Sequence, residues 1–309
     1  MAGRFTVLAS GSSGNAALVE SEGFGLLIDC GLQPRMLTAR LREINLGWER
    51  INAVILTHTH GDHWKDYTLA DLRSRKIPLY GHCEHFEQLA QEAVSYDTLR
   101  LAGLTRMFKD NRLLELAPGL TVQPIRVSHD ANPTFAFRIA YRDVQGMGWS
   151  IGYASDLGCG SAELIEAFAG VDILALEFNH DLRLEERSRR PKVLIDRVLS
   201  DFGHLSNCQA ADLTNKIVSN SGAVSPSHLV QLHLSRECNR PELAAAAGRE
   251  TLARLKLSTE VITARQDAAT KPISLVGKVN QVNRAIGKSV PSCAISRPCV
   301  QPSLPGFDA

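Results

Sequence analysis

Residues 57–63 of the chain read THTHGDH, so three histidines and one aspartate stand within six positions. Imidazole nitrogens and carboxylate oxygens are the usual protein ligands of Zn²⁺, and they also suit Mn²⁺ and Fe²⁺. The segment directly follows the apolar run at residues 53–56. So many ligand-type side chains at one strand end can serve two metal ions. The alternative is a polar turn that carries histidines by chance, and the clustering disfavours it.

The spacing within this segment supports the metal hypothesis. A strand that ends at Thr57 would deliver His58 and His60 to one side, because strand side chains repeat every two residues. The glycine that follows lets the chain turn sharply. Asp62 and His63 would then face the same space from another direction. We therefore expect the rest of the chain to supply the missing ligands.

Three further residues stand at the ends of apolar runs and could complete such a site. His129 could be a third imidazole beside the first two histidines. Two cations held close together repel each other unless an anion lies between them, and Asp156 is the candidate for that bridge. His233 could complete the ligands of the second metal. His228 is its rival, but it would point to the opposite face if the strand runs through.

Four other polar residues are candidates for roles around the metals. Asp29 follows an apolar run and could orient a ligand histidine, although a turn cap is the alternative. His204 and His180 could protonate a leaving group, and Glu177 could hold the histidine that does so. For each of these three the alternative is a structural role, as a capping histidine or a solvated glutamate.

Two segments have simpler explanations. His82 and His85 have ligand-like spacing, but they begin a predicted helix, and we expect them to be structural. Residues 10–15 read SGSSGN, and their small side chains could let backbone amides form a phosphate-binding nest. A tight hairpin explains the same composition.

Composition sets limits on the protein class. The 309 residues suffice for one large or two ordinary domains, and 44% hydrophobic with 22% charged residues is ordinary for a globular protein. The net charge of +1 means that a nucleic-acid partner needs a local basic patch. The seven cysteines are scattered without a C-x-x-C pair, so we expect free thiols in a reducing cytoplasm and no cysteine-ligated zinc. The start of the chain lacks a signal-like apolar segment, and no apolar run reaches the roughly 18 residues of a membrane span.

Periodicity predicts the elements that position these residues. Early strands follow each other closely and later ones are separated by helices, which favours an α/β sandwich of two sheets with helices outside, over residues 1–267. From residue 268 to 309 the periodicity stops, and we predict a disordered tail or else a partner-binding tail. Strands are predicted at residues 5–9, 25–28, 53–56, 120–127, 135–141, 150–154 and 171–176, and helices at 35–44, 86–94, 162–168, 192–199, 209–218 and 241–255.

With these motifs the chain resembles the metallo-β-lactamase superfamily over about residues 4–265. Asp29 is similar to its first motif, residues 58–63 to its second, and His129, Asp156 and His233 to its third, fourth and fifth. The resemblance implies an αββα sandwich of two mixed β-sheets with a dinuclear metal site at the sheet edges. It also implies the ligands: His58, His60 and His129 for one metal; Asp62, His63 and His233 for the other; and Asp156 as the bridge.

Within the superfamily, residues 7–15, 177–181 and 203–207 resemble the YycJ/WalJ-like nuclease branch. The last of these is also similar to the motif around the active-site histidine of ribonuclease Z and of the phosphodiesterase PhnP, and residues 233–235 match their final motif. The long arm with which ribonuclease Z grips tRNA is not evident in the sequence, which disfavours tRNA processing.

The resemblance implies a dinuclear phosphodiesterase, most plausibly an exonuclease-like DNA or RNA nuclease, that uses two Zn²⁺, Mn²⁺ or Fe²⁺ ions. The sequence leaves the oligomeric state open, including a homodimer. A metal-bridging hydroxide would attack phosphorus, because two metals lower the pKa of the water between them. The predicted catalytic residues are His204, Asp62, His180 and Glu177.

The substrate is the open part of this prediction. A basic run could bind backbone phosphates or could be a solvated helix face; it comprises Arg183, Arg187, Arg189, Arg190 and Lys192. A metallohydrolase of a small thioester, lactone or other ester is the alternative, because the same metal site serves all of these. A nonhydrolytic binder or oxygen sensor is disfavoured, since no expected ligand is lost.

Overall fold

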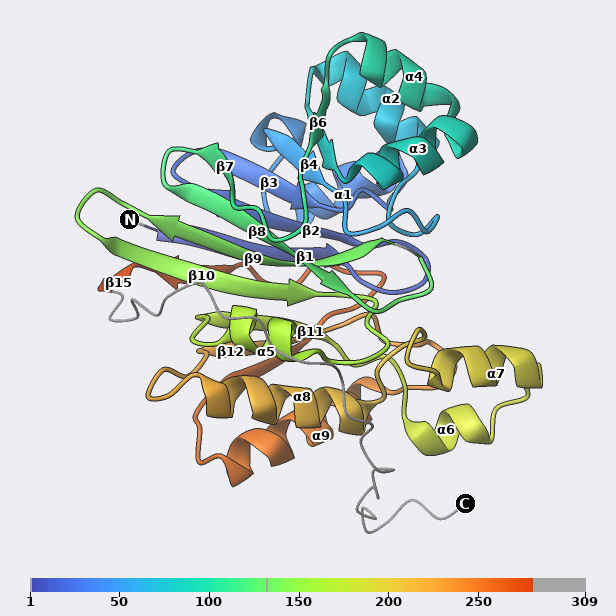
Figure 1. Cartoon of the computed structure of the whole chain (residues 1–309), viewed down its shortest axis with the longest axis vertical. Coiled ribbons are helices and arrows are strands. Elements are labelled where there is room, and N and C mark those ends of the chain that lie inside the picture. The colour runs from blue at the N-terminus through green and yellow to red at the C-terminus, as the bar shows by residue number, and fades with distance from the viewer. Residues whose placement is uncertain (1, 132, 280–309) are drawn as a thin grey trace.

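Two β-sheets stack face to face, and helices cover both outer faces (Figure 1). The computed structural model describes residues 2–131 and 133–279. The first sheet has the order β14-β1-β2-β3-β4-β5-β6; the second has the order β13-β12-β11-β10-β9-β8-β7, with β15 paired to β10. The predicted αββα sandwich of two mixed sheets is confirmed.

Each sheet combines an antiparallel half with a parallel half. β1, β2 and β3 pair antiparallel, and β3 to β6 pair parallel. The first-sheet strands are β1 (Ala2–Ala9), β2 (Ala16–Ser21), β3 (Phe24–Ile28), β4 (Ala53–Ile55), β5 (Leu79–Gly81), β6 (Thr105–Met107) and β14 (Ile273–Val276). β14 pairs with β1 in antiparallel orientation.

In the second sheet β7 to β10 pair antiparallel and β10 to β13 pair parallel. β8 therefore runs in the same direction as β10, β11 and β12, and the carboxyl ends of these four strands share one edge of the sheet. Every candidate ligand outside residues 58–63 follows one of them. The strands are β7 (Leu114–Ala117), β8 (Leu120–Val127), β9 (Thr134–Arg142), β10 (Met147–Ala154), β11 (Ile173–Glu177), β12 (His228–Leu232), β13 (Glu260–Thr263) and β15 (Lys278–Val279).

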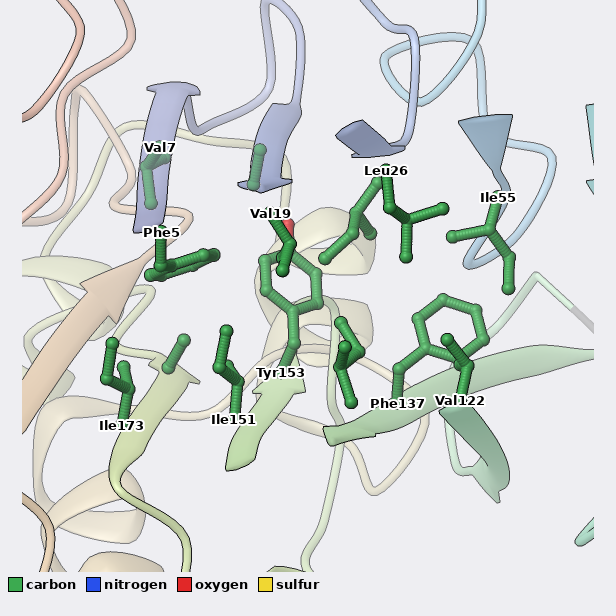
Figure 2. Close-up of a cluster of buried hydrophobic side chains, with 14 of the residues drawn as sticks. Phe5, Val7, Val19, Leu26, Ile55, Val122, Phe137, Ile151, Tyr153 and Ile173 are labelled. Atoms are coloured by element: carbon green, nitrogen blue, oxygen red, sulfur yellow. The ribbon is translucent and has the colours of Figure 1, made fainter. Parts of the chain in front are cut away.

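The core lies between the sheets, where side chains of both inner faces meet (Figure 2). Phe5 and Val19 of the first sheet face Ile151 and Tyr153 of the second, and all four are fully or almost fully buried. Because the period of a strand is two, neighbouring residues such as Leu8 face the helices instead. Burial of both faces explains why these strands read as continuous apolar runs.

The helices pack on the outer faces of the two sheets. The first sheet carries α1 (Pro34–Glu43), α2 (Asp66–Arg75), α3 (Cys83–Glu92) and α4 (Val94–Leu101), together with a 3₁₀ turn at Trp48–Arg50. The second carries α5 (Ala162–Phe168), α8 (Asn207–Asn220) and α9 (Pro241–Arg254). α6 (Leu182–Glu186) and α7 (Lys192–Leu199) project to one side of the sandwich (Figure 1, right). In the described part of the chain, no helix is long and apolar enough to cross a membrane.

The predicted boundary between domain and tail at residue 268 is wrong. β14 extends the first sheet by pairing with β1, and Ile273 and Leu275 contribute to the core. Thr270 Oγ1 also accepts a hydrogen bond of 3.0 Å from the backbone N–H of Val7. Residues 268–279 therefore belong to the sandwich, and the rest of the predicted tail lies outside the described residues. A four-residue strand offers only two inward apolar positions, which is too little for periodicity to reveal.

Candidate metal centre

The histidine-rich segment turns away from β4 and is held by a buried carboxylate. Asp29 follows β3, is fully buried, and accepts a hydrogen bond of 2.8 Å from the backbone N–H of Thr57. Its Oδ2 lies 2.8 Å from Nδ1 of His63, which fixes that ring. The expectation that Asp29 orients a ligand histidine is thus met by a direct contact.

A second anchor comes from the turn between β1 and β2. Asn15 Nδ2 lies 3.1 Å from Asp62 Oδ2 and 2.9 Å from His63 Nε2, and the Asn15 N–H donates to the Asp62 carbonyl at 2.8 Å. Gly31 lies against this carbonyl so closely that any side chain there would collide with it. The segment predicted as a phosphate nest or a hairpin is a hairpin turn, and Asn15 uses it to position two ligand-type side chains.

The first group of ligand atoms combines His58, His60 and His129. One nitrogen from each lies within 4.8 Å of the others. His58 is fully buried, and its Nδ1 lies 3.0 Å from the hydroxyl of Thr57. His129 Nδ1 lies 2.9 Å from the carbonyl oxygen of Gly203, and its Nε2 lies 3.3 Å from His60 Nδ1.

The second group combines Asp62, His63 and His233, again with ligand atoms within 4.8 Å of one another. His233 follows β12, and its Nε2 lies 3.5 Å from Asp62 Oδ2. Its other nitrogen, Nδ1, lies 2.9 Å from Asp156 Oδ1. The rival histidine, His228, begins β12 instead and lies 3.5 Å from Glu260.

Asp156 lies between the two groups, as the bridging hypothesis requires. Its Oδ2 is 3.0 Å from His63 Nε2, and its Oδ1 is 3.9 Å from His129 Nε2. The residue is buried and has a left-handed backbone with φ of 58°. The structure therefore brings together all seven residues predicted as metal ligands.

The donor set fits divalent metal ions. Nε2 of His58 and Nε2 of His233 are buried without a hydrogen-bond partner, which is costly for a polar atom unless a ligand binds it. Burial and the neighbouring His63 lower the pKa of His58 well below its usual value, so the ring stays in the neutral form that binds metals. Five imidazoles and two carboxylates are ligands that Zn²⁺, Mn²⁺ and Fe²⁺ accept.

Glu177 connects the second metal group to the candidate acid. It ends β11, is fully buried, and its Oε2 accepts backbone N–H bonds from Leu157 at 2.9 Å and Leu205 at 3.1 Å. Its Oε1 lies 2.7 Å from His204 Nδ1 and 3.1 Å from His233 Nδ1. Burial raises the pKa of the Glu177 carboxyl, but His204 outweighs this effect and the pKa falls to about 2.

His204 is thereby prepared to carry a proton. Burial lowers the pKa of its imidazole, but the adjacent Glu177 carboxylate outweighs this and raises the pKa above its usual value. Its side chain is 18% exposed, whereas that of Glu177 is fully buried. Since Glu177 occupies Nδ1, Nε2 is the ring nitrogen through which His204 would donate to a substrate.

His180 does not share this arrangement, and its role as a proton donor stays a prediction. It is fully buried, and both ring nitrogens lack a hydrogen-bond partner among the described residues. Burial lowers its pKa to about 4, so the ring is neutral near pH 7. Its backbone pairs with Ser206, beside the loop that carries His204. His82 and His85 form the capping box that begins α3, as expected.

One acidic residue beside the centre was not singled out in the sequence. Asp130 Oδ1 lies 3.3 Å from His129 Nε2 and 3.5 Å from His60 Nε2. Its Oδ2 forms an ion pair with Arg197 of α7. Its position directly after the predicted ligand His129 could have marked it as a candidate in the sequence.

Comparison with known proteins places the chain in a family. The model of the beta-lactamase superfamily domain matches residues 25–228. The chain belongs to this superfamily. It is 29% identical over 248 residues to exodeoxyribonuclease WalJ of Streptococcus pneumoniae, with 78% of this chain and 85% of that protein covered. It is 28% identical over 246 residues to exodeoxyribonuclease YycJ of Bacillus anthracis, with the same coverage.

Solved structures agree with this assignment of the fold. The metallo-β-lactamase fold protein YhfI of Bacillus subtilis superposes with a TM-score of 0.62 at 18% identity, covering 87% of this chain and 99% of that one. The predicted resemblance to the metallo-β-lactamase superfamily and its WalJ/YycJ-like branch is confirmed. The family and the named relatives support a metal-dependent hydrolase.

Proposed function

We propose that this protein uses two divalent metal ions to hydrolyse phosphodiester bonds in nucleic acid, as an exonuclease. The observation that carries the proposal is the pairing of His204 with Glu177, 2.7 Å apart, beside the two groups of ligand atoms. Departure of an alkoxide from a phosphodiester needs a proton donor, and a histidinium held by a carboxylate can supply it. The named exodeoxyribonuclease relatives support the same chemistry.

Each residue of the centre has a distinct task. His58, His60 and His129 would hold one ion, Asp62, His63 and His233 the other, and Asp156 would touch both. Two such ions supply Lewis acidity, a water activated near neutral pH and neutralisation of the phosphate oxygens. Glu177 fixes the His204 ring through Nδ1, and the proton leaves His204 toward the departing oxygen. Asp29 and Asn15 hold the ligand rings in place.

Surface features near the centre favour a nucleic acid over a small ester. Phe202 is 61% exposed, two positions before His204. Its loop is fixed on both sides, because Ser128 Oγ donates to the Asp201 carbonyl at 2.7 Å and the Gly203 carbonyl contacts His129. A rigid exposed aromatic ring beside the acid can stack on a nucleobase.

The basic run of α6 and α7 divides into two sets. Arg183, Arg187 and Arg189 are exposed and can meet backbone phosphates. Arg190 instead pairs with Glu185 at 3.3 Å and Glu237 at 2.5 Å, which ties this region to the loop after β12. Lys192 pairs with Asp196 at 2.6 Å. Within this run, we therefore assign phosphate binding to Arg183, Arg187 and Arg189.

The activity test uses purified protein with Mn²⁺ or Zn²⁺. It should hydrolyse bis-p-nitrophenyl phosphate and degrade end-labelled DNA or RNA from an end. Single- and double-stranded forms of each nucleic acid identify the preferred substrate. Hydrolysis of S-lactoylglutathione with diesters left intact would favour the small-ester alternative and contradict the proposal.

The ligand assignment is tested by Asp62→Ala. This change should abolish diester hydrolysis and lower the metal content from about two ions per chain. Asp97→Ala serves as the control, because Asp97 is exposed and forms an ion pair with Arg100 on its own helix. Metal content equal to that of the unchanged protein would refute Asp62 as a ligand.

A further inference from the structure

A cavity of about 340 Å³ adjoins the metal centre between the loop after β12 and the segment after β13. Ser10 and Leu234 line it on the side of the ligands. Ser10 Oγ accepts a hydrogen bond of 2.8 Å from the backbone N–H of His233, and Leu234 is the next residue. The cavity therefore shares a wall with the second metal group.

The lining of the cavity is strongly positive. Arg236, Arg240 and Arg265 contribute three cationic groups and Asp267 contributes one anionic group. This concentration is notable in a chain whose total net charge is only +1. Such a surface attracts phosphate, because guanidinium groups bind phosphate oxygens in a bidentate manner.

Most of this charge is not compensated by the protein. Arg265 Nε lies 3.1 Å from Asp267 Oδ1, which uses the single carboxylate of the lining. Among the described residues, the Arg240 guanidinium donates to two carbonyl oxygens, those of Glu237 at 3.2 Å and Asn239 at 2.6 Å, and to no carboxylate. Arg236 is exposed and lies near enough to Asp267 to lower the pKa of that carboxyl, so Arg236 and Arg265 share the single carboxylate of the lining.

The walls of the cavity are joined by hydrogen bonds, so its shape does not depend on a ligand. The Ser10 N–H donates to the Arg265 carbonyl at 3.0 Å. Gln266 spans the two walls, since its Oε1 accepts from the Ser13 N–H at 3.3 Å and its Nε2 donates to the Leu234 carbonyl at 3.3 Å. A preformed site loses little conformational entropy on binding.

We propose that this cavity binds a phosphate group of the nucleic-acid strand next to the scissile bond, through Arg236, Arg240 and Arg265. The inference rests on the proposed function, in which the metals hold the scissile phosphate itself. The cavity volume falls within the range of sites for small molecules and nucleotides. The bound group is either a terminal monophosphate or an internal phosphodiester, which present the same oxygens to the arginines.

The test replaces the three arginines by glutamine, singly at Arg236 and together in a triple variant. Substrates are a 5′-phosphorylated oligodeoxynucleotide, its 5′-hydroxyl and 3′-phosphorylated forms, and bis-p-nitrophenyl phosphate. The triple variant should lose about tenfold or more in kcat/KM on DNA. In a plot of log kcat/KM against log salt concentration, the slope should become shallower by about one for each phosphate contact that is lost. Hydrolysis of bis-p-nitrophenyl phosphate, which has no neighbouring phosphate, should stay within about twofold, since no part of the metal centre changes.

Arg254→Gln is the matched control, because Arg254 is an exposed arginine at the end of α9 and does not line the cavity. A loss restricted to one end-phosphorylated form identifies a terminal monophosphate, and an equal loss on all DNA forms identifies an internal phosphodiester. Unchanged cleavage of DNA, or an equal loss on DNA and bis-p-nitrophenyl phosphate, would overturn the inference while the proposed function stands. If the unchanged protein cleaves neither substrate, the proposed function fails and the inference with it.

Discussion

The two sheets contribute to the metal centre in different ways. The first sheet delivers four ligand-type side chains in one loop, residues 58–63, directly after β4. The second sheet delivers His129, Asp156 and His233 singly, from the ends of three strands. The first half therefore depends on one local turn, whereas the second half depends on the register of a whole sheet.

Each half has its own buried carboxylate as an organiser. Asp29 holds His63 and Thr57 on the first sheet, and Glu177 holds His233, His204 and two backbone amides on the second. Asp29, Asp156 and His233 all have left-handed backbones, with φ of 60°, 58° and 54°. Such conformations cost about 1 kcal/mol or more each and persist only where the surroundings hold them. The geometry of the metal centre therefore depends on Asp29 and Glu177 as well as on the ligand residues.

The largest loss of diester hydrolysis is expected from a change at Asp156, which lies between the two groups of ligand atoms. Asp156→Ala removes the carboxylate between the groups, so the repulsion between two cations is no longer offset. Diester hydrolysis should fall by at least about a thousandfold, because several kcal/mol of Lewis-acid stabilisation are lost. Metal analysis of the purified variant checks the cause. A variant that keeps its full metal content would show that the halves do not depend on this bridge.

Removal of the acid should separate catalysis from metal binding. His204→Ala should slow cleavage of DNA by about 10²- to 10⁴-fold with metal content unchanged. The loss on bis-p-nitrophenyl phosphate should be smaller, because its leaving group needs little protonation. Loss of metal in this variant would make His204 a ligand, and equal losses on both substrates would argue against a proton donor.

The two organising carboxylates give a direct comparison of the halves. Asp29→Asn and Glu177→Gln should each lower metal affinity by about 10- to 100-fold, since outer carboxylates orient ligand rings. Only Glu177→Gln should also reduce turnover at saturating metal, because only Glu177 holds His204. Metal titrations of diester hydrolysis separate affinity from turnover. Equal turnover losses in the two variants would contradict the division of roles.

The smallest effect on DNA cleavage is expected at Phe202, the exposed aromatic residue beside His204. Phe202→Ala should lower kcat/KM on single-stranded DNA by about tenfold, because one stacked base contributes roughly 1–3 kcal/mol. Hydrolysis of bis-p-nitrophenyl phosphate should be unchanged. Val193→Ala on α7 is the control, since Val193 is an exposed apolar residue at 82%. An equal effect of the two changes on DNA cleavage would remove the stacking role.

The sequence predicted the first half of the site more completely than its surroundings. Residues 58–63 are contiguous, so their chemistry is visible without a fold. His129, Asp156 and His233 were found because each follows a strand long enough to show as an apolar run. The link from Glu177 to His233 was not predicted, because it joins residues 56 positions apart through the pairing of β11 with β12.

Other parts of the fold were missed where the signal was short. The catalytic role of His180 stays a prediction, and the turn after β11 buries its ring. β14 was missed, as were β5 and β6, because strands of three or four residues do not establish an alternating pattern. Helices with long amphipathic faces, such as α8 and α9, were predicted close to their observed bounds.

A metal titration of chelator-stripped protein tests the two-metal hypothesis most directly. Mn²⁺ or Zn²⁺ is returned stepwise, and bound metal and bis-p-nitrophenyl phosphate hydrolysis are measured in the same samples. Hydrolysis should reach its maximum at about two ions per chain, the number that two ligand groups with a bridging carboxylate require. Maximal hydrolysis at one ion per chain, or hydrolysis that persists in the stripped protein, would contradict a dinuclear phosphodiesterase.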